Sequence, residues 1–227
     1  RVTWFGEDDS KKIVGEAKAI LEETGVFVEN GEARELLAGA GAKIEAGRVK
    51  IPASAVEKAL ETAPGRILVY DRHGEVAMDL GGDRLHFNPG SAALRIFDPE
   101  SGDARTPVTA DVVRFATLTD ALANYAAQST GLVPGDVPEE IADRYRVFLG
   151  LQYSTKPVVT GTFRKEAFEV MRAMLSAVAG GDGKLREKPI AIFDCCPSPP
   201  LSWSDLTCQA LIDCARTGLP AELVSMP

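Results

Sequence analysis

NYAAQST at residues 124–130, PVVTGTF at 157–163, IAIFDCC at 190–196 and AELVSM at 221–226 decide the fold of this chain. These stretches are short, mostly apolar and bounded by turn residues, which is typical of strands buried in a parallel sheet. Their first residues lie 33, 33 and 31 positions apart. Such even repeats, with helical patterns between them, predict an α/β fold built on a closed or doubly wound parallel sheet.

Helical patterns fill the gaps, because apolar residues recur there every three or four positions. The predicted helices run from Thr109 or Asp111 to Leu122, from Glu139 to Tyr153, from Lys165 to Ala179 and from Ser204 to Thr217. LHFNPG, at residues 85–90, adds a fifth predicted strand. A TIM (β/α)8 barrel needs eight strands. We therefore predict that residues 84–227 are the first βα units of such a barrel and that the chain stops before the barrel closes.

Residues 1–83 have a different pattern, which predicts a cap of helices and short strands before the barrel. An amphipathic helix is stopped by Gly25, and Asn30 can cap a second helix. KIEAGRVKIP, at residues 43–52, predicts a hairpin, and Pro52 can open the helix that follows. Short strands are predicted in residues 67–87.

Composition excludes several classes of protein. The 227 residues carry 25 Lys and Arg against 33 Asp and Glu, a net charge of −8, so the basic surface of a nucleic-acid or anionic-membrane binder is missing. No apolar run is long enough to span a membrane, and we expect a cytoplasmic protein. The four cysteines form no CxxC pair and only two histidines are present, which argues against disulfides and a metal site.

Candidate functional residues follow from the predicted barrel, because the working residues of barrels lie at the carboxyl ends of the strands. Those ends are residues 88–91, 128–130, 160–162, 194–198 and 225–227, nearly all small, polar and uncharged. Asp194 is the exception. A carboxylate after an apolar strand must be paired with Arg or Lys, or must face a cavity that binds a cation. The sequence leaves both alternatives open.

Nucleophiles and nucleotide sites are not indicated. Cys195 and Cys196 follow the third strand, but both histidines, His73 and His86, precede the repeats, so no partner for a thiolate is placed nearby. Glycine-rich phosphate-binding motifs are absent. The aromatic residues Phe163, Phe193 and Trp203 stand near strand ends, where an aromatic ring can pack in the core or face a cationic ligand.

Six stretches, in the same order along almost the whole chain, closely resemble the trimethylamine:corrinoid methyltransferase family. They are ILEETGVFVE, AGAKIEAGRVKIP, LHFNPG, STKPVVTG, CPSPPLSWS and LIDCARTGLPAELVSMP. The resemblance implies a TIM barrel with N-terminal additions and a longer polypeptide. It also implies a methylated amine as substrate and transfer of its methyl group to the cobalt of a separate corrinoid protein. Some members carry pyrrolysine in the part of the barrel that would follow Pro227.

The resemblance leads to expectations for the site. Many relatives act on quaternary amines such as glycine betaine, and we expect a betaine-like substrate. Asp194 and Phe193 would lie near its cationic nitrogen, whereas Asn88, Thr160 and Thr162 would donate or accept hydrogen bonds. No catalytic residue is assigned. No cofactor is expected to bind directly, because the methyl acceptor is the corrinoid (cobalamin) of the partner protein. No nucleic acid or membrane partner is expected.

Two other functions remain open. The chain could be a module that binds a methylated amine or a corrinoid protein without catalysis. An unrelated barrel lyase or aldolase is disfavoured, because the lysines that could form a Schiff base fall in helix ends or loops. These lysines are Lys156, Lys165, Lys184 and Lys188. The last predicted strand has no helix after it to cover it, so we also expect self-association.

Overall fold

The computed structural model describes residues 4–224, which form two compact units. Among these residues, the first unit holds residues 4–64 and 196–209, and the second holds residues 65–195 and 210–224. Helix α8 (Asp205–Thr217) contributes residues to both units. The compact units divide the chain at other positions than the predicted cap, residues 1–83, and barrel part, residues 84–227. That predicted division stays a prediction.

A parallel sheet forms the centre of the second unit. Its strands are β8 (Gln128–Ser129), β9 (Val158–Thr160), β10 (Ala191–Cys195) and β12 (Ala221–Leu223), in the order β12-β10-β9-β8. All neighbouring pairs are parallel. The mixed α/β fold with a parallel sheet is therefore confirmed, and each strand falls within one of the four predicted stretches. Closure of this sheet into a barrel stays a prediction.

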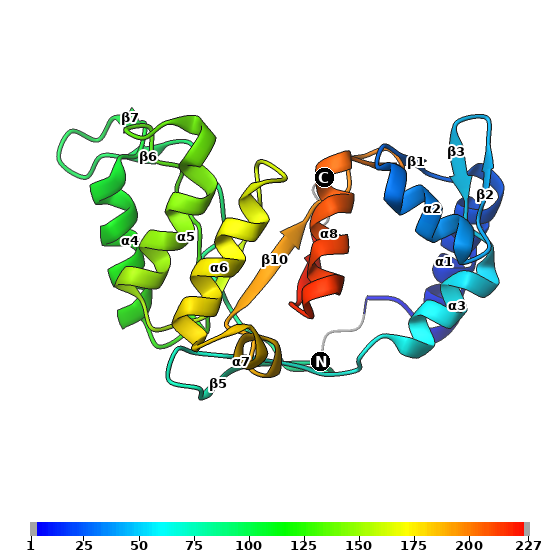
Figure 1. The fold of residues 1–227 in the computed structure, drawn as a ribbon, viewed down its shortest axis with the longest axis horizontal. Coiled ribbons are helices and arrows are strands. Elements are labelled where there is room, and N and C mark those ends of the chain that lie inside the picture. The colour runs from blue at the N-terminus through cyan, green and yellow to red at the C-terminus, as the bar shows by residue number, and fades with distance from the viewer. Residues whose placement is uncertain (1–3, 225–227) are drawn as a thin grey trace. The chain divides into compact units, whose positions relative to one another are not determined.

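Helices cover one face of this sheet. Helices α4 (Thr109–Ala121), α5 (Ala142–Tyr153, after the 3-10 turn Glu139–Ile141) and α6 (Ala167–Ala179) lie side by side (Figure 1). All three were predicted, whereas the short α7 (Asp182–Glu187) was not. The side chains that fill the space between helices and sheet are almost inaccessible to solvent; they include Val147, Phe168, Met171, Leu175 and Phe193.

A hairpin covers the opposite face at the amino ends of the strands. Its strands, β4 (Ile67–Tyr70) and β5 (Val76–Leu80), lie in the stretch predicted to hold short strands, and they pair antiparallel. Val69 and Met78 of this hairpin form one buried cluster with Ala127, Val159 and Ile192. Because side chains alternate along a strand, Asp194 lies on the same face as Ile192, nearer the carboxyl edge, whereas Phe193 faces the helices.

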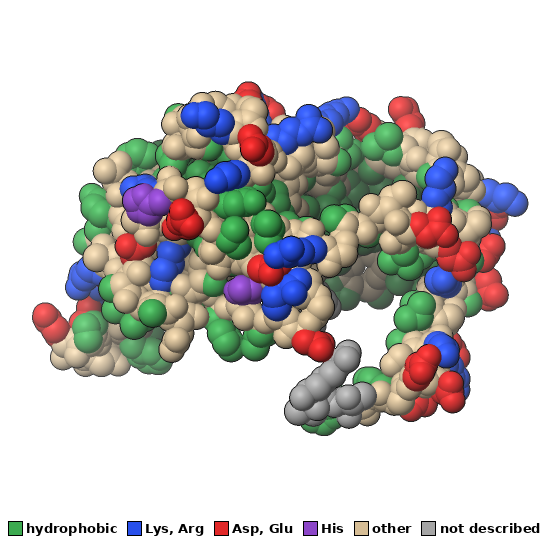
Figure 2. Space-filling view, turned by 90° about the horizontal axis from the view of Figure 1, so that it is seen from below, with side chains coloured by type: hydrophobic (Ala, Val, Ile, Leu, Met, Phe, Trp, Pro, Cys, Tyr) green, Lys and Arg blue, Asp and Glu red, His purple; other side chains and the backbone are tan. Residues whose placement is uncertain are grey.

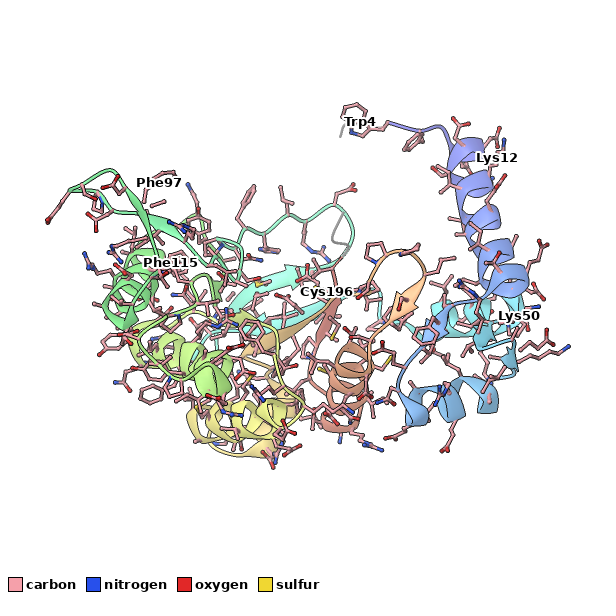
Figure 3. The ribbon with its side chains drawn as sticks, turned by 90° about the horizontal axis from the view of Figure 1, so that it is seen from above. Trp4, Lys12, Lys50, Phe97, Phe115 and Cys196 are labelled. Carbon is pink, nitrogen blue, oxygen red and sulfur yellow. The ribbon has the colours of Figure 1, made fainter. Side chains whose placement is uncertain are left out.

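The structure of residues 85–107 differs from the prediction in one respect. The strand predicted at residues 85–90 is wrong, since backbone pairing there is limited to a single parallel bridge between Phe87 and Tyr125. Pro89 has no N–H to donate, and the Asn88 side chain accepts a hydrogen bond from the Gly90 N–H, which turns the backbone away. The segment continues into a hairpin of β6 (Ile96–Phe97) and β7 (Ala104–Arg105), from which Phe97 projects (Figure 3).

The first unit follows the predicted elements closely. Helix α1 (Glu7–Ala19) continues as a π-helical turn (Ile20–Thr24) that ends at Gly25. The Asn30 side chain accepts a 2.8 Å hydrogen bond from the Ala33 N–H, so the predicted cap of α2 is confirmed. The remaining elements are β1 (Phe27–Val28), α2 (Gly31–Gly39), β2 (Lys43–Glu45), β3 (Arg48–Lys50), α3 (Ala53–Thr62) and β11 (Ser202–Trp203). Strands β2 and β3 form the predicted hairpin, and β1 pairs parallel with β11.

The described surface carries charges of both signs. On the face shown in Figure 2, acidic and basic side chains are interspersed with apolar ones. Among residues 4–224, no helix combines the length and the apolar composition that crossing a membrane requires.

Gly131, two residues after the end of β8, has no room for a side chain. A Cβ atom there would lie 2.3 Å from Cζ of Phe115, which projects from α4 (Figure 3). We expect Gly131→Ala to destabilise the protein by about 1–3 kcal/mol, because this contact forces the ring or the backbone to move. Thermal unfolding measures the effect.

The double variant Phe115→Leu, Gly131→Ala should recover part of that loss, since the smaller side chain removes the clash. Gly39→Ala is the matched control, because a Cβ at Gly39 meets no atom within 4 Å. Equal melting temperatures for Gly131→Ala and the wild type would contradict the packing of α4 on the strand end.

Candidate functional site

The carboxyl ends of the strands meet at one edge of the parallel sheet, as the sequence predicts. The register places Phe193 beside Thr160 and Asp194 beside Glu222. In a parallel pair, such neighbours project on the same face. Asp194 and Glu222 are therefore two carboxyl groups side by side at this edge.

Asp194 is a partly buried carboxyl group without a compensating ion pair. Its Oδ1 atom is buried and accepts no hydrogen bond, and within residues 4–224 no Lys or Arg forms an ion pair with it. Burial, reinforced by the negative charge of Glu222 and a hydrogen bond to that residue, raises the pKa of Asp194 from 3.8 to about 7. The Arg146 charge opposes this shift. Of the two alternatives left open by the sequence, the direct salt bridge is absent from the described part of the chain.

Arg146 brings a buried positive charge to the same edge. It projects from α5, is 2% exposed, and donates a 2.7 Å hydrogen bond from Nη1 to the Thr130 carbonyl at the end of β8. Its guanidinium carbon lies 4.4 Å from the centre of the Phe163 ring. Burial lowers the pKa of Arg146 to about 10, and the charges of Asp143 and Asp194 oppose this shift. Arg146 is therefore a cation at neutral pH.

Asp143, three residues before Arg146, binds the backbone of the loop after β9, which contains Phe163. This carboxylate is 1% exposed; Oδ2 accepts a 2.9 Å hydrogen bond from the Phe163 N–H, and Oδ1 accepts one of 2.8 Å from the Arg144 N–H. Helix α5 thus fixes the loop after β9 at two points, the backbone through Asp143 and the aromatic ring through Arg146. Phe163 itself stays 43% exposed.

The structure gathers the predicted site residues at this edge but turns two of them toward the helices. Phe193 is completely buried, with its ring centre 4.7 Å from that of Phe168. The Thr160 hydroxyl is also buried and lies 3.1 Å from the Thr130 hydroxyl. Substrate contacts of Phe193 and Thr160 stay predictions, and both side chains are closed to solvent here.

Thr162 and Asn88 lie in loops at the same edge. Thr162 is half-buried in the loop that Asp143 and Arg146 hold. Asn88 is exposed, and its segment is joined to the end of β8 because the Ser129 hydroxyl donates to the Gly90 carbonyl. Their roles as hydrogen-bonding partners of a substrate stay predictions. The predicted strand end at residues 225–227 lies outside the described residues.

The comparison with known proteins decides the family. The chain matches the trimethylamine methyltransferase (MTTB) family over residues 1–226. It belongs to the MTTB family. The relatives of this MTTB chain include trimethylamine methyltransferase MttB of Desulfitobacterium hafniense, 29% identical over 98% of the chain, and MttB of Methanosarcina barkeri, 28% identical over 98% of the chain. Glycine betaine methyltransferase of Desulfitobacterium hafniense is 28% identical over 97% of the chain. These matches confirm the resemblance read from the sequence.

The MTTB chain spans about half the length of these curated relatives, between 45% and 46% of each. Its strands therefore correspond to one part of the relatives' sequences. The residues at its sheet edge are one contribution to whatever site the longer proteins form.

Cysteines and metal ligands are the remaining candidates for chemistry in this MTTB chain. All four cysteines are thiols in the structure, and burial raises the pKa of Cys208 and of Cys214, which disfavours the thiolate. In the part of the chain that the structure describes, His, Cys, Asp and Glu form no group of three that could hold a metal ion.

Sequence reasoning missed Arg146, Asp143 and Glu222. The one available indication was the pair Asp143 and Arg146, one turn apart in a predicted helix and flanked by Val147 and Gly150 on the face that the sheet buries. Glu222 sits inside a predicted strand, and only the register shows that it neighbours Asp194. Charged residues inside buried elements are therefore the feature to examine in this family.

Asp194 makes stability depend on pH. Folding raises its pKa from 3.8 to about 7, so the folded state holds the proton more tightly than the unfolded state. The free energy of unfolding should fall as pH rises from 4 to 7 and carry the full penalty above 7. Asp194→Asn removes the penalty, so its melting temperature should exceed that of the wild type by more at pH 8 than at pH 5.

Asp103→Asn, at an exposed position, is the control and should give the same small shift at both pH values. A stabilisation by Asp194→Asn that is equal at pH 5 and pH 8 would show that the Asp194 carboxyl group is not perturbed.

Proposed function

We propose that the protein containing this chain transfers a methyl group from a quaternary amine to the cobalt of a corrinoid on a partner protein. Family membership supports the reaction class, and the names of the relatives, trimethylamine and glycine betaine methyltransferases, support a methylated amine as substrate. One observation in the structure carries the assignment of a site. Asp194 is a carboxyl group without an ion pair at a strand edge where most side chains are polar and uncharged.

The chemistry makes modest demands on the protein. The reduced cobalt of the partner's corrinoid attacks the methyl carbon, the carbon–nitrogen bond breaks, and its electron pair stays on nitrogen, so a quaternary amine leaves as a neutral tertiary amine. No proton moves. The protein has to hold the methyl group toward the cobalt and exclude water, because correct orientation removes much of the entropic barrier.

Asp194 supplies a negative charge, which is what the recognition of a quaternary ammonium requires. Such a cation has no N–H group, so recognition depends on electrostatic attraction and apolar contact with its methyl groups. The carboxylate of Asp194, with Glu222 beside it, provides the attraction. The exposed part of the Phe163 ring provides an apolar surface at the same edge.

Cation binding and ionisation of Asp194 are coupled in this proposal. Because the pKa of Asp194 is about 7, roughly half of the molecules carry the neutral carboxyl group at neutral pH. A bound cation favours the ionised form, so affinity should rise with pH and level off above 7. Acid conditions should weaken binding.

A module that binds a methylated amine or a corrinoid protein without catalysis is the second candidate. The negative charge of Asp194 supports it too, because the attraction of a methylated ammonium to a carboxylate does not depend on transfer of the methyl group. A cytoplasmic location of the whole protein and self-association of the isolated chain remain part of the proposal.

The test supplies the full-length protein with its corrinoid partner in the cob(I) state and each of trimethylamine, glycine betaine, carnitine and proline betaine. Methyl transfer is followed by the change in the cobalt absorption spectrum. We expect methyl transfer from at least one quaternary amine, and we expect this transfer to need no added nucleotide. Binding of an amine without methylation of the cobalt would favour the binding module.

The Asp194→Asn variant tests whether Asp194 belongs to the amine-binding site. At pH 8 the variant should bind the active amine about tenfold more weakly, a loss of about 1.4 kcal/mol, with a smaller effect on the rate at saturation. Titration calorimetry measures the affinity, and Asp103→Asn serves as the control. An unchanged affinity of Asp194→Asn would remove Asp194 from the amine site while leaving the reaction class intact.

A further inference from the structure

We infer that Arg146 is a positioning residue of this edge: its buried guanidinium holds the Phe163 ring in place and supplies the positive charge that acts on the Asp194 side chain. The inference deepens the proposed function and rests on it for the identity of the ligand, a quaternary ammonium. The charge of Asp194 can nevertheless be measured without any ligand.

The hydrogen bonds of Arg146 do not account for its burial. A guanidinium carries five N–H donors, and a buried one normally has them satisfied. Here the guanidinium donates one bond, from Nη1 to the Thr130 carbonyl, while the buried Nε finds no acceptor among the described residues. The whole residue is only 2% exposed. A residue that served packing alone would cost less as an apolar side chain of similar size.

Asp143 does not neutralise Arg146 by direct contact. Both carboxylate oxygens of Asp143 accept backbone N–H groups, of Arg144 and Phe163. Among residues 4–224 no ion pair joins Asp143 to Arg146. The positive charge of Arg146 therefore acts through space, on Asp143 and on Asp194, and these are its two electrostatic partners.

Asp194 needs such a cation because the rest of its surroundings favour the neutral acid. On β12, Glu222 lies beside it and repels a second negative charge. Directly after β9 stands Gly161, which has no side chain; a Cβ there would lie 3.4 Å from the Asp194 carbonyl. On α5, Asp143 adds further negative charge near Arg146. Arg146 is thus the positive charge acting on Asp194 from the described elements packed against it.

The stacking on Phe163 gives Arg146 its second role. The guanidinium lies 4.4 Å from the ring centre, and Asp143 fixes the Phe163 backbone, so ring and backbone are held from the same helix turn. A flat guanidinium can cover the face of an aromatic ring, whereas Lys would keep the charge without the flat surface. The two roles can therefore be separated by substitution.

The first measurement is the pH titration of the Asp194 carboxyl group in the full-length protein without ligand, by carbon-13 NMR, with Asp194→Asn identifying the signal. Arg146→Met should raise the midpoint by about one pH unit, because the favourable charge is lost. Arg146→Lys should leave it close to the wild-type value. Arg144→Met, on the same helix, is the matched control and should not move it.

The second measurement is the binding of tetramethylammonium between pH 5.5 and pH 9. We expect Arg146→Met to bind about fivefold more weakly than Arg146→Lys at pH 7 and within about twofold of Arg146→Lys at pH 9, where Asp194 is ionised in both variants, since both lose the ring contact and only the Met variant loses the charge. Arg146→Lys should bind more weakly at all pH values, because the ring is no longer held. A loss of packing alone would weaken Arg146→Met equally at every pH.

The two measurements separate the inference from the function. If the Asp194 midpoint is the same in wild type and Arg146→Met, the inference is overturned, whatever binds. If the midpoint moves but tetramethylammonium and the methylated amines bind to no protein, the role of Arg146 toward Asp194 stands and the proposed function fails.

A folding defect in Arg146→Met would not stop the test. In that case the double variant Arg146→Met, Asp194→Asn should melt higher than Arg146→Met at pH 8, because the uncompensated carboxylate has been removed. Melting temperatures in which the two substitutions act additively would overturn the inference.

Discussion

The parallel hydrogen bonding of β8, β9, β10 and β12 is the constraint on which the rest of the second unit depends. Because all four strands run the same way and strands that follow one another in the chain are neighbours in the sheet, right-handed connections return along one face, and α5 and α6 lie on that face beside α4 (Figure 1). The same direction brings every strand's carboxyl end to one edge. The hairpin β4–β5 covers the amino half of the opposite face, so polar side chains of that face remain only near the carboxyl edge.

Much of this arrangement could be predicted from the sequence. Apolar strand patterns at even spacing, with helical patterns between them, indicated a parallel sheet built from βα units. Asn30 could be identified as a helix cap because its side chain and the following helix are local features. The strand predicted at residues 85–90 was wrong for a local reason as well. An apolar alternation cannot reveal that Asn88 and Pro89 withdraw the backbone from pairing.

The candidate site could be predicted only in part, because its electrostatics depend on contacts between elements. Asp194 stood out as the charged residue among polar strand ends. Whether Asp194 had a salt bridge depended on where α5 would place Arg146, and on the register that sets Glu222 beside it. The alternation of side chains along β10 does predict one feature of the site. Phe193 and Asp194 cannot face the same side, so a site built on Asp194 leaves Phe193 in the helix-covered core.

In the proposed function, two opposite charges that do not touch fit this edge for a reaction without proton transfer. A direct Arg146–Asp194 ion pair would neutralise the carboxylate and leave little attraction for a cation. A lone Asp194 would take up a proton, since burial and Glu222 both favour the neutral acid. Arg146 avoids both outcomes, because it lies within electrostatic reach of Asp194 while its hydrogen bond goes to the Thr130 carbonyl. Asp194 then carries its negative charge in about half of the molecules at neutral pH, and a bound ammonium group shifts it further toward the carboxylate.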